Sequence, residues 1–178
     1  MPQDKILLRL AGLACLVGAG LRAAGAFPSL HVPYQGTEAL YFAVDLLLTL
    51  GLVGLFAGVA RFRTWLGVVG FVGALAGFEL IRTGARLGGG DAYQRNSAIL
   101  GLALAVAGLA LLGGKGVVRF VGVSWLTSIA VGLAGAALRL PMAFTAASLL
   151  FCAGFVFAGV VLLQGGEAGG RTARRRAA

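Results

Sequence analysis

The chain is dominated by long apolar runs separated by short polar or glycine-rich breaks. A membrane-spanning helix needs about 20 consecutive, mostly apolar residues. Six runs reach that length, and the breaks between them leave no room for a soluble domain. The pattern therefore predicts an all-α membrane protein, a bundle of six transmembrane helices. The expected helices are residues 6–27, 38–60, 64–83, 96–114, 117–138 and 142–164.

The chain divides into a transmembrane domain, residues 1–164, and a polar tail, residues 165–178. The tail is rich in glycine and arginine, so we expect it to be flexible. Arginines just beyond a membrane helix are attracted to anionic lipid headgroups by about 1 kcal/mol each. Lipid contact is the expected role, and docking of a cytoplasmic partner is the alternative. The arginines concerned are Arg171, Arg174, Arg175 and Arg176.

Composition supports the membrane assignment and changes how the charge is interpreted. The chain is 59% hydrophobic and 12% charged, whereas soluble domains carry about 25% charged residues. Its net charge is +9, but the basic residues lie in the tail and mostly at the ends of apolar runs. This distribution sets membrane orientation and argues against nucleic-acid binding.

The residues that usually hold cofactors are scarce. Cys15 and Cys152 both fall inside apolar runs, where a cysteine acts as a small hydrophobic residue. The single histidine, His31, lies in a predicted loop between two prolines. We therefore expect no disulfide, no metal site and no bound cofactor.

The distribution of basic residues predicts that both termini are cytoplasmic. With six helices the termini share a side, and that side collects ten of the fifteen lysines and arginines. Cytoplasmic loops are enriched in these residues. The sequence Ala24-x-Ala26 resembles a signal-peptidase site, but Arg22 just before it favours a retained first helix. We expect a multi-pass protein of a bacterial inner membrane.

Asp45 is an acid inside an otherwise apolar run, "YFAVDLLLTLGLVGLFAG", at residues 41–58. An ionised group at the bilayer centre costs about 2.5–3.5 kcal/mol, so it needs a partner or a polar cavity. One polar stripe on this helix is expected from residues that recur at spacings of three and four, namely Glu38, Tyr41, Asp45 and Thr49. We expect Arg22 or Arg139 to pair with Asp45.

Asp45 belongs to a group of charged residues that the predicted topology gathers in the outer half of the membrane. One interpretation is an ion-pair network that fixes the bundle. The other is an outward-facing polar pocket for a charged small molecule. The residues of this group are Arg22, Glu38, Asp45, Glu79, Arg82 and Arg139.

The sequence resembles the HdeD-type family of six-helix bacterial membrane proteins, which is associated with acid resistance. The resemblance covers residues 6–164. It rests on three consecutive helical hairpins, on an Asp in the second helix, and on Arg-x-x-Gly-type starts such as "RLAG" and "RFVG". It implies a stress-related role. The Pro-Gly turns of that family are absent here.

The absence of a catalytic motif leads us to expect a non-enzymatic accessory or structural protein, assembling with itself or within a larger membrane complex. The alternative is a solute-binding or transport protein, similar in layout to the substrate-binding component of energy-coupling-factor transporters. A third interpretation is a lipid-modifying enzyme, for which Asp45 and Glu79 are the one candidate acid/base pair.

Overall fold

The computed structural model describes residues 2–26, 34–87 and 89–165, with the side chains of residues 5–26, 39–83 and 95–165. This part of the chain is all helical, and its six α-helices are each long and apolar enough to cross a membrane. The predicted six-helix architecture is therefore confirmed. The helices are α1 (Pro2–Gly25), α2 (Tyr34–Gly58), α3 (Trp65–Leu87), α4 (Gly89–Leu112), α5 (Val117–Leu138) and α6 (Pro141–Leu163), with a 3-10 helix, η1 (Ala60–Arg63), between α2 and α3.

Four helices extend further into polar sequence than the apolar runs indicate, and two of them do so at their starts, since α1 begins at Pro2 and α2 at Tyr34. α3 continues to Leu87, and α4 begins at Gly89, so the polar stretch before Asn96 is helical. The apolar part of α4 begins only at Arg95. Hydropathy marks the part of a helix that fits the hydrocarbon core, whereas backbone hydrogen bonding continues into polar residues at the membrane surface.

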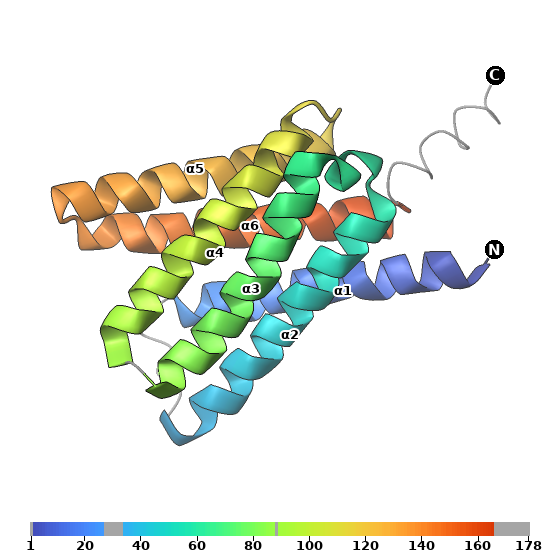
Figure 1. Ribbon diagram of the computed structural model, residues 1–178. Helices are drawn as coiled ribbons and strands as arrows, with labels where there is room; N and C mark the ends of the chain where they lie inside the picture. The colour runs from blue at the N-terminus through green and yellow to red at the C-terminus, as the bar shows by residue number, and fades with distance from the viewer. Residues whose placement is uncertain (1, 27–33, 88, 166–178) are drawn as a thin grey trace.

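The helices pack in the order α3, α4, α5, α6, α1, α2, and each is in contact with the next. Contact between α2 and α3, which η1 connects, is the least extensive between consecutive helices. Figure 1 shows that α1 begins and α6 ends at the same end of the bundle, which we call the proximal end. The opposite end, where α1 ends and α6 begins, is the distal end.

Pairs of glycines let backbones meet near the proximal end. A Cβ on Gly12 of α1 would lie 2.9 Å from the carbonyl oxygen of Gly159 on α6. Gly108 of α4 and Gly122 of α5 face each other in the same way. Towards the distal end, the α5–α6 hairpin runs away from α3 and α4 (Figure 1). The bundle is therefore tight at one end and wedge-shaped at the other.

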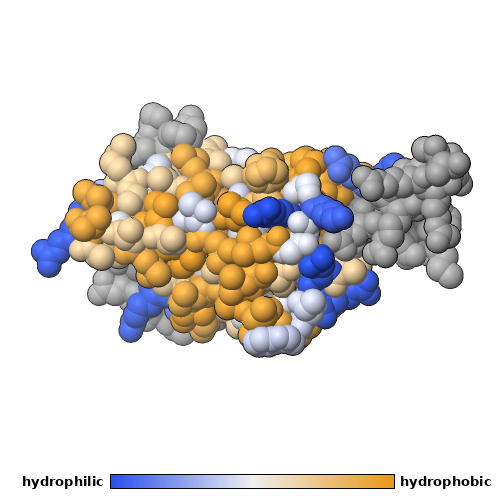
Figure 2. Space-filling model, turned by 90° about the horizontal axis from the view of Figure 1, so that it is seen from above, coloured by the Kyte–Doolittle hydropathy of each residue, from blue (hydrophilic) through white to orange (hydrophobic). Residues whose placement is uncertain are grey.

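The core and the outer surface are both apolar, as expected for a membrane protein. Trp125 is 1% exposed and contacts the rings of Phe62 and Phe155. Trp65 is 73% exposed at the start of α3. Large apolar side chains cover much of the surface seen in Figure 2, with hydrophilic residues concentrated towards the ends. Such a surface suits lipid contact.

The glycine contacts predict which substitutions the fold tolerates. Gly122→Ala places a methyl group against the backbone of Gly108, and overpacking of this kind costs about 1–3 kcal/mol. Gly20→Ala is the matched control, because nothing lies within 4 Å of the position where its Cβ would be. We expect a lower thermal-unfolding midpoint in detergent micelles for Gly122→Ala alone. Equal midpoints for the two variants would contradict the close α4–α5 contact.

Candidate functional site

Asp45 lies at the distal end of the buried face of α2. Leu48, Leu52 and Leu55 follow it at helical spacing and are fully buried. Asp45 itself is 4% exposed, so the helix that buries these leucines also turns the carboxylate inward. The hydroxyl of Thr49 donates a hydrogen bond to the backbone carbonyl of Asp45 at 2.7 Å. The Thr49 hydroxyl therefore donates its hydrogen bond to the backbone of its own helix and not to the Asp45 carboxylate.

The structure pairs Asp45 with Arg22, one of its two predicted partners. Nη1 of Arg22, in the last turn of α1, lies 3.6 Å from Oδ1 of Asp45. The side chains are 15% and 6% exposed, respectively. The separation is longer than a hydrogen bond, so the attraction is electrostatic. The guanidinium also lies 5.4 Å from the ring centroid of Phe151 on α6. Arg22 therefore connects three helices.

Arg82 and Glu79 form a second pair on α3. Nη1 of Arg82 donates a hydrogen bond to Oε1 of Glu79 at 2.8 Å. The Arg82 guanidinium lies 4.9 Å from the ring centroid of Phe42 on α2, three residues before Asp45. The Glu79 side chain is 66% exposed. Four of the six charged residues in the predicted group thus form two pairs, and each pair contacts α2.

Other predicted site residues lie elsewhere. Arg139 is exposed at the end of α5, with a left-handed backbone (φ 53°), and no ion pair is recorded for it among the described residues. It is the C-cap residue of α5, and its backbone N–H donates hydrogen bonds to the carbonyl oxygens of Ala136 and Gly135. The side chain of Glu38, the loop residue His31 and the tail arginines lie outside the described residues.

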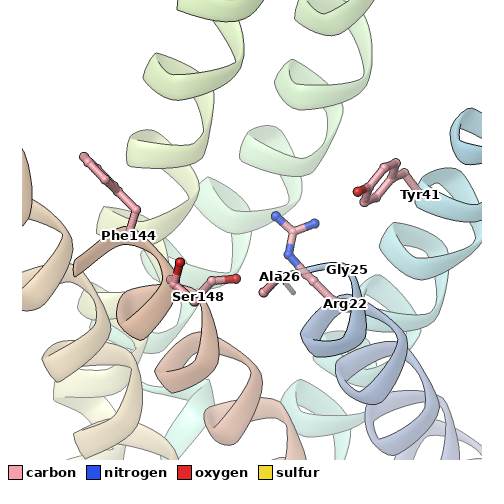
Figure 3. Close-up of a pocket in the computed structure, with 7 residues that line it drawn as sticks. Arg22, Gly25, Ala26, Tyr41, Phe144 and Ser148 are labelled. Atoms are coloured by element: carbon pink, nitrogen blue, oxygen red, sulfur yellow. The ribbon is translucent and has the colours of Figure 1, made fainter. Parts of the chain in front are cut away.

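A pocket of about 260 Å³ lies beside Arg22 at the distal end, between α1, α2 and α6. Figure 3 shows the Arg22 side chain pointing into the space between Tyr41 of α2 and Ser148 of α6. The lining combines one guanidinium, three hydroxyl groups and a small apolar surface. The lining residues are Arg22, Gly25, Ala26, Tyr41, Phe144, Thr145 and Ser148.

The α6 side of this pocket was not predicted as a site. The spacing of Thr145, Ser148 and Cys152 indicates one polar face on α6, but hydroxyls on membrane helices usually bond to other helices or to their own backbone. Ser128 of α5 behaves in that way, donating to the carbonyl oxygen of Ala147 at 2.7 Å. Only the packing of α6 against α1 reveals which hydroxyls face Arg22.

The lining favours an anionic or hydrogen-bond-accepting group over a cation. It contains the positive charge of Arg22 and no carboxylate. Guanidinium groups bind carboxylates and phosphates through charge-assisted hydrogen bonds. The first turns of α6 also form part of the wall, and the positive end of a helix dipole attracts anions. No cluster of metal-binding residues occurs among the described residues.

Comparisons with known proteins add no assignment. No protein-family model, curated protein or solved structure matches the chain. The resemblance to the HdeD-type family, and the repeat of three hairpins on which it rests, therefore stay predictions. The site has to be interpreted from its own geometry.

The Arg22–Asp45 pair predicts unequal costs for removing either partner. Arg22→Leu leaves a short carboxylate buried without its counter-charge, and breaking a buried pair costs about 3–5 kcal/mol. Asp45→Leu costs less, because the arginine that remains has a long side chain near the distal surface. We expect the Arg22→Leu/Asp45→Leu double variant to be more stable than Arg22→Leu.

Thermal unfolding of the wild type, both single variants and the double variant in micelles measures this coupling. A double variant whose loss equals the sum of the two single losses would show that Arg22 and Asp45 do not interact.

Proposed function

We propose that this chain is a non-enzymatic, multi-pass membrane protein that binds the acidic group of a small molecule in the distal pocket. The proposal rests on one observation, which is that the Arg22 side chain has two neighbours at once. The residue faces Asp45 on α2 and also lines the pocket. The pair with Asp45 holds a guanidinium at a site with space beside it.

The pocket chemistry suits binding better than catalysis. Arg22, Tyr41 and Ser148 can donate hydrogen bonds to a carboxylate or phosphate. The two carboxylates considered as an acid/base pair each face a different arginine: Asp45 faces Arg22, and Glu79 faces Arg82. Neither carboxylate lines the pocket.

The sequence-based interpretation as an accessory subunit of a larger complex stays a prediction. So does the position of the termini in the cytoplasm. If the termini are cytoplasmic, the distal pocket lies towards the outer face of a bacterial inner membrane. An acidic solute would then reach it from outside the cell.

Native mass spectrometry of protein extracted gently from its membrane tests the proposal. We expect one small acidic molecule per chain, and we expect Thr145→Val/Ser148→Ala to lose it. Thr127→Val is the matched control, because Thr127 is exposed on α5 and does not line the pocket.

Equal retention by the pocket variant and the control would contradict binding in the pocket. Copurifying polypeptides without any bound small molecule would also contradict it, and would favour the accessory-subunit prediction.

A further inference from the structure

The size of the distal pocket limits what it can enclose. Pockets that bury drug-sized ligands measure about 300–1,000 Å³, and this one measures about 260 Å³. It can hold an acidic group and a few attached atoms. A larger ligand must extend out of the pocket along the surface of the helices.

The pocket lies near the ends of three apolar spans, on the distal side of the bundle. The apolar spans of α1, α2 and α6 end or begin, at this end of the bundle, at Gly25, Ala39 and Pro141. Ser148, the lining residue deepest in its span, is seven residues past Pro141, or about 10 Å at 1.5 Å per residue. The other described lining residues lie closer to the span ends, where a bilayer carries its phosphates.

Apolar side chains surround the polar lining. Phe144 and Tyr41, which form part of the wall, are 51% and 46% exposed. Leu21 and Leu149, the sequence neighbours of Arg22 and Ser148, are 40% and 36% exposed. These side chains lie on the surface of membrane-spanning helices. An acyl chain leaving the pocket would meet apolar surface on either side.

We infer that the acidic group bound at Arg22 is the headgroup of an anionic membrane lipid, whose acyl chains lie along α1 and α6. This inference rests on the function proposed above and specifies the class of ligand. The headgroup phosphate meets the Arg22 guanidinium and the hydroxyls of Thr145 and Ser148. A free phosphate ion offers the same acidic group without the chains.

Native mass spectrometry of delipidated protein in non-ionic micelles distinguishes these sources. Three probes are added separately: phosphatidylglycerol, phosphatidylcholine and inorganic phosphate. We expect one phosphatidylglycerol per chain at concentrations where neither other probe binds. Loss of a hydrogen bond to a charged group weakens binding by about tenfold or more, so we expect at least that loss in Thr145→Val/Ser148→Ala.

Two further variants complete the test. Arg22→Leu/Asp45→Leu removes both charges together, so it avoids a lone buried carboxylate, and it should also lose the lipid. Arg139→Asn is the matched control, since it removes an exposed distal arginine outside the pocket and asparagine tolerates the left-handed backbone. We expect unchanged binding in this control.

The outcomes separate this inference from the proposed function. Pocket-dependent binding of inorganic phosphate, as tight as that of the lipid, would overturn the lipid assignment and leave the proposed function standing. Lipid binding that all variants retain would place the lipid elsewhere and overturn the inference. Binding of none of the three probes would overturn the lipid assignment, and the function proposed above would then depend on the molecule retained from the native membrane.

Discussion

The burial of one carboxylate is the constraint on which the distal end of this bundle depends. Asp45 lies on the same face of α2 as fully buried leucines and is itself 4% exposed. Its negative charge requires a positive charge close by. Arg22 meets that requirement from α1, at 3.6 Å, and its contact with Phe151 brings in α6. The same requirement brings a guanidinium to the pocket wall.

The pocket also depends on where the helices can approach closely. Gly12 and Gly159 bring α1 against α6 towards the proximal end, and Gly108 and Gly122 do the same for α4 and α5. The α5–α6 hairpin then diverges from α3 and α4 towards the distal end (Figure 1). Close packing at one end and charged side chains at the other leave a polar space beside Arg22. Small residues and charges thus have complementary roles in shaping the site.

Much of the architecture could be predicted from hydropathy, because each span must shield its backbone within about 30 Å of hydrocarbon. The sequence also identified Asp45 and offered Arg22 as a partner, since helical spacing and depth are local properties. It could not choose between Arg22 and Arg139, because that choice depends on which helices are neighbours. For the same reason, Thr145 and Ser148 were recognised as a polar face but not as a wall of the pocket. The polar start of α4 was missed because hydropathy does not report helix ends in polar sequence.

The most direct test of this account is an electron cryomicroscopy map of the protein in lipid nanodiscs, with a rigid antibody fragment bound to aid alignment. The account predicts that the Arg22 guanidinium lies beside the Asp45 carboxylate. It also predicts non-protein density at hydrogen-bonding distance, about 2.7–2.9 Å, from the guanidinium. A map in which Arg22 points away from Asp45, or in which side chains fill the pocket, would contradict it.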